Sequence, residues 1–209
     1  MATDLVMGSR VDHMAAIGPQ YVRWLSLCAA MIAMTGSVSL AAPDGDPEVV
    51  VRESGGVYSV AATFSVTEAS GIAIAVLTDF ERIPTFMPDM KTSIVLEQND
   101  ASTLVEQEAM ARFMMFSKRV HLVLRVNERD GTIRFRDECG KSFARYDGLW
   151  KVTAKDGGAA IEYQLSAKPK FDVPAFVLTR LMKRDAIQMI GRLHAETTRR
   201  AAASTLRPH

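Results

Sequence analysis

The chain has 209 residues, of which 48% are hydrophobic and 23% are charged, and this composition is typical of a globular protein with one core of good size. The formal net charge is +1, with 25 Lys and Arg residues against 24 Asp and Glu residues. The sequence therefore lacks the strongly basic signature of a nucleic-acid-binding protein, and we expect one domain plus an additional segment.

Residues 1–41 are predicted to form a secretory signal peptide. Arg23 precedes an apolar run from Trp24 to Met34, and the small residues Ser39 and Ala41 form a cleavage site. We expect export across the inner membrane, with the periplasm as the destination. The alternative is an uncleaved N-terminal segment that anchors the protein in the membrane.

The chain after the signal peptide is predicted to begin with a linker. Residues 42–56 are rich in Pro and Gly, which indicates a linker. Residues 57–66 alternate between apolar and small polar side chains and predict the first strand. A short helix is expected within residues 67–79. Two prolines restrict residues 80–90 to a second short helix or a turn-rich connection.

A meander of about six further antiparallel strands is predicted between Met90 and Pro174, which gives a sheet of about seven strands. Alternation of apolar and polar residues indicates that one face of this sheet is buried. Turn signals are expected to separate the strands at Asn99-Asp100, Asp130-Gly131, Asp147-Gly148 and Asp156-Gly157-Gly158.

The longest helical pattern runs from Pro174 to about Ala203, which sets the domain at residues 57–203 and leaves 204–209 as a tail. Its apolar face contains Leu178, Met182, Ala186, Met189, Ile190, Leu193 and Thr197, and its polar face contains Arg180, Arg184, Gln188, Arg192 and Arg199. The basic face is a candidate for peripheral contact with an anionic membrane, although a solvated helix face explains the same pattern.

These elements predict an α+β helix-grip fold, in which a curved antiparallel sheet wraps around a long C-terminal helix, with two short helices after strand one. Small side chains on the inner face would leave a cavity between sheet and helix. The predicted small inward residues are Ala62, Ala109 and Ala111, the predicted walls are Phe113, Phe135, Trp150 and Tyr163, and the adaptable helix residues are Met182 and Met189.

Three sequence segments resemble a known family: residues 77–88, 146–150 and 157–163. Their order and spacing are similar to those of the START-like (SRPBCC) superfamily and, within it, of the polyketide cyclase/dehydrase and lipid-transport family, which includes coenzyme Q-binding proteins. The resemblance covers residues 57–200. It implies a hydrophobic cavity for a lipid, an isoprenoid quinone or a polyketide-like molecule. The chain departs from the family between Pro84 and Pro88, where aromatic residues are common in relatives: this entrance segment has no Trp and has Phe86 instead.

The polar residues offer little recognisable chemistry. His121 and His194 are expected at the surface or at the edge of the helix, and Cys139 is the only thiol left after signal removal. Asp137 shares its parity with the inward residues of its strand, so it is expected to face the cavity. Gln107 and Tyr163 could orient a ligand oxygen or satisfy buried backbone groups.

The predicted function is binding or transport of a hydrophobic small molecule. No phosphate-binding glycine loop and no His, Cys and carboxylate cluster indicates a cofactor or metal. No histidine lies in a recognisable catalytic motif, which favours a binding protein over an enzyme. The alternative is a cyclase or aromatase-type enzyme that acts on a small hydrophobic substrate in the same cavity. The sequence leaves the oligomeric state open.

Overall fold

The computed structural model describes residues 47–113 and 116–206, with the side chains of Phe113 and Phe116 outside the described part. These residues belong to the second of two units of the chain, residues 43–209. The predicted signal peptide lies outside the described residues.

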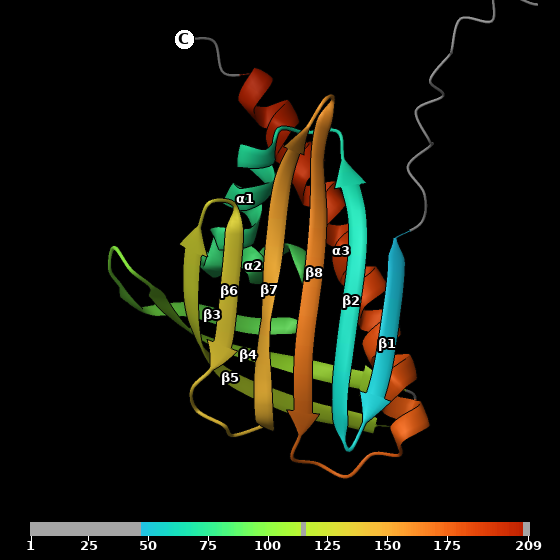
Figure 1. Cartoon of the computed structure of the whole chain (residues 1–209). Helices are drawn as coiled ribbons and strands as arrows, with labels where there is room; N and C mark the ends of the chain where they lie inside the picture. The colour runs from blue at the N-terminus through green and yellow to red at the C-terminus, as the bar shows by residue number, and fades with distance from the viewer. Residues whose placement is uncertain (1–46, 114–115, 207–209) are drawn as a thin grey trace, which may run out of the picture. The chain divides into compact units, whose positions relative to one another are not determined.

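Eight strands form one antiparallel sheet with the order β1-β2-β8-β7-β6-β5-β4-β3 (Figure 1). The strands are β1 (Glu48–Ser54), β2 (Val57–Val66), β3 (Met90–Gln98), β4 (Thr103–Phe113), β5 (Phe116–Arg129), β6 (Thr132–Asp137), β7 (Phe143–Lys155) and β8 (Gly158–Pro169). Strands β3 to β8 follow one another as hairpins, and β2 joins them by pairing with β8. The meander is therefore confirmed, and the sheet has one more strand than predicted.

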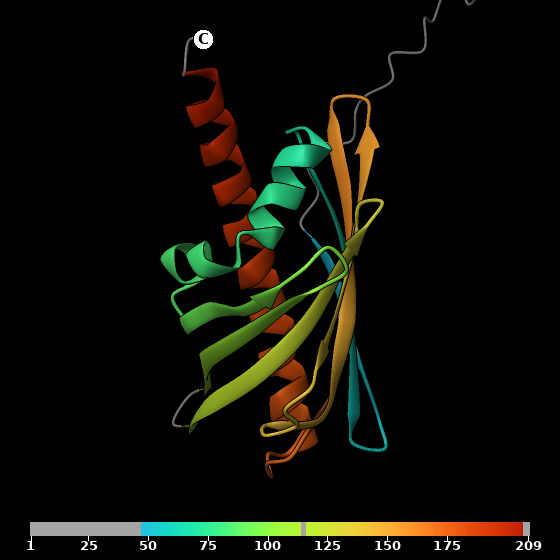
Figure 2. The ribbon, with the colours of Figure 1, turned by 90° about the vertical axis from the view of Figure 1, so that its left-hand side faces the viewer.

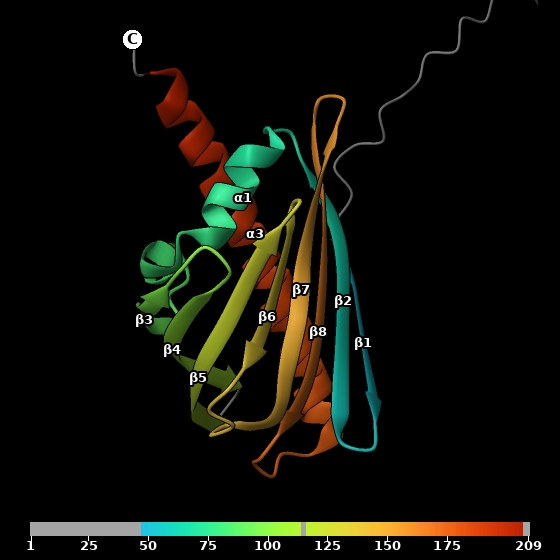
Figure 3. The same cartoon turned by 60° about the vertical axis from the view of Figure 1, so that its left-hand side comes forward.

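The sheet curves around the long helix α3 (Ala175–Thr205), as the predicted helix-grip fold requires (Figure 2). The helices α1 (Ser70–Thr78) and α2 (Ile83–Phe86), with the 3₁₀ helix η2 (Phe80–Arg82) between them, follow β2. They pack beside the C-terminal half of α3 (Figure 3). In the described ranges, no helix is both long enough and apolar enough to cross a membrane.

The core lies between the concave face of the sheet and α3. Alternate residues of β2 and β5 are buried, as the period of two predicts, including Val60, Phe64, Leu122 and Leu124. On α3, the predicted apolar face is buried or half-buried at every position. The helical phase is therefore confirmed, although Gln188 and Arg192 on the predicted polar face also line the interior cavity.

The predicted linker is wrong for residues 48–54, which form the edge strand β1. Val49 and Val51 pair with Ala62 and Val60 of β2, and Val49 is buried in the core. The two glycines that suggested a linker, Gly55 and Gly56, have positive φ angles and form the tight β1–β2 turn. Three successive valines supply the strand propensity that the surrounding Pro and Gly residues obscured.

The turn predicted at Asp147-Gly148 is also wrong, because both residues lie within the continuous strand β7. Asp147 pairs with Ser166 and Gly148 pairs with Leu165 of β8. A Cβ atom at position 148 would lie 2.6 Å from Cζ of Phe135 and would also collide with the carbonyl oxygen of Gln164. The glycine therefore admits the Phe135 ring against the strand instead of forming a turn.

Candidate ligand-binding cavity

A cavity of about 380 Å³ lies between the inner face of the sheet, the α1–α2 segment and α3. Its volume falls within the range of small-molecule pockets, about 300 to 1,000 Å³. Small side chains on β4, Ala109 and Ala111, leave space opposite the helix residues Met182 and Met189. The α1–α2 segment closes another side with apolar side chains, including Leu77, Phe80 and Phe86.

Most of the residues predicted for the cavity wall are present there. The lining includes the predicted residues Phe86, Gln107, Ala109, Ala111, Phe135, Trp150, Tyr163, Met182 and Met189. The side chain of Phe113 lies outside the described part of the chain, so its predicted role stays a prediction. Ala62 is buried in the core and is not part of the lining.

Asp137 does not face the cavity, so this part of the prediction is wrong. Its Oδ1 accepts hydrogen bonds from the backbone N–H of Val123 at 2.9 Å and of Cys139 at 3.2 Å, and its Oδ2 accepts one from Gly140 at 3.0 Å. The strand parity fails here because β6 ends at Asp137, and the carboxylate instead satisfies free N–H groups of the following turn.

Aromatic rings from β6, β7 and β8 form one wall of the cavity. Trp150 and Tyr163, which pair across β7 and β8, have ring centroids 4.2 Å apart. The Tyr146 ring lies 4.9 Å from that of Phe143 and 6.0 Å from that of Phe135. Sequence reasoning missed Tyr146 and Phe143, although Tyr146 has the same parity as Trp150 once β7 is a single strand.

The polar residues of the lining are the uncharged Gln107, Tyr146, Tyr163 and Gln188 and the charged Asp89, Asp185 and Arg192. Gln107 is buried and donates to the Ser93 hydroxyl at 3.1 Å. Burial raises the pKa of Tyr146 to about 12 and raises the pKa of Tyr163 well above its usual value of 10.0. Of the acidic lining residues, Asp89 and Asp185 have side chains that are 55% and 43% exposed.

Asp185 is the carboxylate of the lining whose pKa is raised. Burial raises it, and the hydrogen bonds and charge of Arg184, whose Nη2 lies 2.8 Å from Asp185 Oδ1, oppose that shift. The lining residues that are also exposed, among them Pro88, Asp89 and Gln188, mark where the cavity reaches the surface, between the α2–β3 connection and α3.

The residues singled out for possible catalysis do not line the cavity. His121 lies on the outer face of β5, where its ring nitrogens are 3.4 Å from Glu106 and 3.6 Å from Glu108. Cys139 lies in the turn after β6, with its sulfur 3.2 Å from Asp137 Oδ1. His194 is half-buried on α3 outside the lining. Within residues 47–113 and 116–206, no group of three or more His, Cys, Asp and Glu residues could hold a metal ion.

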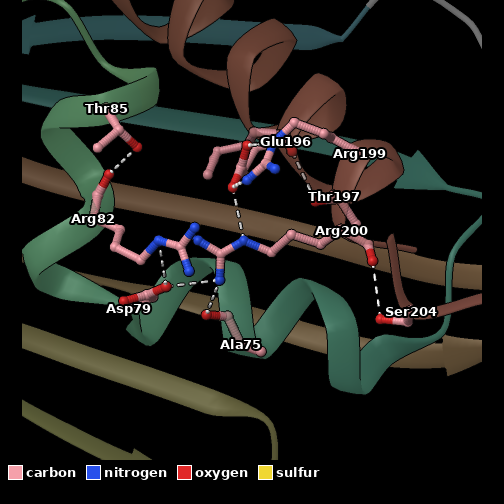
Figure 4. Close-up of polar contacts among 10 residues, drawn as sticks. Ala75, Asp79, Arg82, Thr85, Glu196, Thr197, Arg199, Arg200 and Ser204 are labelled. Carbon is pink, nitrogen blue, oxygen red and sulfur yellow. Dashed lines mark hydrogen bonds and ion pairs between the residues drawn. The ribbon is translucent and has the colours of Figure 1, made fainter. Parts of the chain in front are cut away.

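A polar network attaches the α1–α2 segment to α3 beside the cavity (Figure 4). Arg200 on α3 forms an ion pair with Asp79 at 2.9 Å and donates to the carbonyl oxygen of Ala75 at 3.2 Å. Glu196, which is only 5% exposed, accepts hydrogen bonds from Arg199 and Arg200, each at 2.7 Å. The bonds from Arg199, and then those from Arg200, lower the pKa of Glu196 to about 2 despite its burial.

This architecture is that of a START-like, helix-grip protein, and comparisons with known proteins agree. The model of the polyketide cyclase/dehydrase and lipid transport family matches residues 75–193, more than half of the chain. The chain therefore belongs to the polyketide cyclase/dehydrase and lipid transport family. No curated protein matches the sequence.

Several solved structures share the fold at low sequence identity. The STAR-related lipid transfer protein from Xanthomonas axonopodis is 15% identical, with a TM-score of 0.57, over 74% of this chain and 99% of that one. The Zhui aromatase/cyclase from Streptomyces sp. R1128 is 14% identical, with a TM-score of 0.60, over 69% and 96%. A START superfamily protein from Mycobacterium smegmatis is 14% identical, with a TM-score of 0.60, over 68% and 97%. At these identities the similarity establishes the fold alone.

Proposed function

We propose that this protein binds and transports a hydrophobic small molecule, such as a lipid, an isoprenoid or a polyketide-like compound, in the cavity between the sheet and α3. The observation that carries the proposal is the cavity of about 380 Å³, whose interior walls are aliphatic and aromatic. Burial of an apolar ligand there is favoured by about 25 cal/mol for each Å² removed from water. Membership of a family that includes lipid-transport proteins supports this assignment.

Catalysis of a cyclisation is the second candidate, and Asp185 is the observation that favours it. A carboxylate with a raised pKa at the edge of a cavity is a candidate general base, and the Zhui aromatase/cyclase shares the fold. The interior, however, offers Tyr146, whose pKa of about 12 is far from the range in which a general acid or base works best near neutral pH. Binding without reaction therefore accounts best for the cavity.

Solvent extraction and mass spectrometry of the purified full-length chain test the proposal. A carrier is expected to retain a hydrophobic compound in near-stoichiometric amount, because the cavity shields it from water. An enzyme is expected to release its product, so a chain that retains nothing and converts an added polyketide-like substrate would contradict the carrier assignment.

We further propose that the protein acts in the cell envelope after export. The support is the sequence of residues 1–41, with its positively charged flank, apolar run and small residues before Ala42. These residues lie outside the described part of the chain. Cleavage would release a domain in the periplasm, whereas retention of the apolar run would anchor it.

Peripheral contact with an anionic membrane is proposed for one exposed face of α3. Phe176, Arg180, Lys183 and Ile187 are spaced as one helical stripe, and all four are exposed. Two cations flanked by two apolar side chains suit a negatively charged lipid surface. Cell fractionation with intact-mass measurement tests both the cleavage of residues 1–41 and the membrane contact. The expected species lacks residues 1–41 and dissociates from membranes at high salt. An uncleaved species that stays with membranes at high salt would contradict cleavage and would support an N-terminal membrane anchor.

A further inference from the structure

Two phenol hydroxyls of the cavity wall have no hydrogen-bond partner among the described residues. Tyr146 and Tyr163 both line the cavity, and no hydrogen bond joins either hydroxyl to another described residue. Among the described residues, the buried side-chain atoms that lack a partner are Oε2 of Glu68 and Nη2 of Arg200, and neither phenol oxygen is among them. Because neither phenol oxygen has a hydrogen-bond partner among the described residues and neither is fully buried, both oxygens are accessible from the cavity.

The two strands bring these groups to one aromatic wall. Tyr146 and Trp150 lie four residues apart on the inner face of β7, and Tyr163 lies opposite Trp150 on β8. Tyr163 is 6% exposed. The phenols are close enough that the charge of an ionised Tyr146 would raise the pKa of Tyr163. Both tyrosines line the same cavity, so a single ligand there is offered two phenol groups.

The hydrogen-bonding groups of this wall determine which polar group of a ligand can bind there. Burial keeps both phenols protonated near neutral pH, so each can donate a hydrogen bond. The charged lining residues with half-exposed side chains, Asp89 and Asp185, are acidic and lie at the edge. Arg192 is the cation of the described lining, and its charge is not among those that shift the pKa of either phenol, so a carboxylate placed at the two phenols would lose its hydration without gaining that cation, which is costly. A neutral acceptor oxygen avoids that cost.

We propose that Tyr146 and Tyr163 form a hydrogen-bonding subsite for the carbonyl oxygen of a neutral, flat, unsaturated ligand. The rings of Trp150 and Tyr163, tilted by 31° with centroids 4.2 Å apart, give this wall an aromatic surface that favours a flat conjugated group over a flexible chain. The inference rests on the proposed function, because it assigns the class of ligand that the same cavity takes. It disfavours fatty acids, which carry a carboxylate.

Calorimetric titration of the full-length chain with three naphthalene compounds tests the subsite. Acetylnaphthalene carries a carbonyl, ethylnaphthalene has similar shape without it, and naphthoate carries a carboxylate. The wild type is expected to bind the ketone most tightly. Tyr146→Phe and Tyr163→Phe should each weaken ketone binding about 3- to 10-fold, the effect of one lost hydrogen bond, and leave ethylnaphthalene binding unchanged.

Tyr58→Phe is the matched control, since Tyr58 is also a buried tyrosine but lies outside the cavity lining, and it should change neither affinity. The infrared carbonyl band of bound acetylnaphthalene should also shift to higher frequency in the Tyr146 and Tyr163 variants. Equal binding of ketone and hydrocarbon, preferred binding of naphthoate, or ketone affinities unchanged in both variants would overturn the subsite and leave the carrier function intact. Failure of the wild type to bind any of the three compounds would overturn both.

Discussion

Replacing Glu196 with glutamine is expected to lower the free energy of unfolding at pH 7 by about 3 kcal/mol, the cost of removing one partner from a buried ion pair. Glu196 is almost fully enclosed and receives hydrogen bonds from two arginines. The substitution keeps the size of the side chain, so the loss reports the charge and not the packing. Arg200, with a side chain only 17% exposed, would then keep Asp79 as its remaining ionic partner.

The dependence on pH identifies the cause of this loss. Folding lowers the pKa of Glu196 from 4.5 to about 2, so its stabilising contribution is fully present above about pH 4.5 and is lost as the pH falls towards 2. Denaturant midpoints of the wild type and Glu196→Gln should therefore differ by a constant amount from pH 8 to pH 5 and converge below it.

Glu162→Gln provides the control for this experiment. Glu162 pairs with Lys151 at 3.7 Å on the surface, where both side chains are about half-exposed. Loss of such a pair is expected to change stability by no more than about 0.5 kcal/mol. Equal losses in the two variants, or a Glu196→Gln difference that stays the same down to pH 2, would contradict a stabilising role for the Glu196 charge.

The network also matters to the cavity, because it holds one of its walls. Arg200 is bonded to Ala75 and Asp79, and the intervening Val76 and Leu77 face the cavity. The ion pairs thus fix the α1–α2 segment on α3 at the positions where that segment contributes apolar lining. Helical spacing alone places Glu196 beside Arg199 and Arg200. The contacts of Arg200 with Ala75 and Asp79 could not be predicted in this way, since they form only after the fold has brought α1 against α3.

The fold could be predicted where hydrophobic periodicity is strong. The apolar face of α3 and the alternation of β2 and β5 are properties of consecutive residues, and the structure confirms both. The two errors, at β1 and at Gly148, have a different cause. A pair of glycines such as Gly55-Gly56 is compatible with both a linker and a hairpin turn. Whether the Asp147-Gly148 pair forms a turn or continues a strand depends on the ring of Phe135, which is distant in the sequence.

The apolar residues of the cavity wall could also be predicted from the alternation of inward and outward residues along each strand. Strand parity placed Ala109, Ala111 and Trp150 on the inner face correctly. Parity misplaced Asp137 because the strand ends there, and it missed Tyr146 because the predicted turn divided β7 into two strands. The polar contacts of the site therefore required the three-dimensional structure, whereas most of its apolar lining did not.

The substitution Ala111→Phe is expected to abolish binding of an apolar ligand while the protein remains folded. Ala111 lies on β4 and lines the cavity opposite α3, so a phenyl group there would occupy the space that a ligand needs. Because the ring enters a space of about 380 Å³, it should cause little strain. In a filled core the same change would cost about 1 to 3 kcal/mol through overpacking.

Ala61→Phe is the matched control, because Ala61 is exposed on β2 and the same added ring would remain outside the core. Its binding and its unfolding midpoint should equal those of the wild type. This control separates an effect of the lost cavity from a general effect of an added aromatic residue.

Titration of the wild type and the two variants with phenylnaphthylamine, a neutral apolar fluorophore, tests the cavity most directly when it is combined with thermal unfolding of each protein. We expect saturable binding by the wild type and by Ala61→Phe, at least about tenfold weaker binding by Ala111→Phe, and similar unfolding temperatures for all three. A wild type that binds no fluorophore, together with a strongly destabilised Ala111→Phe, would show that the interior is fully packed and would contradict a ligand-binding cavity.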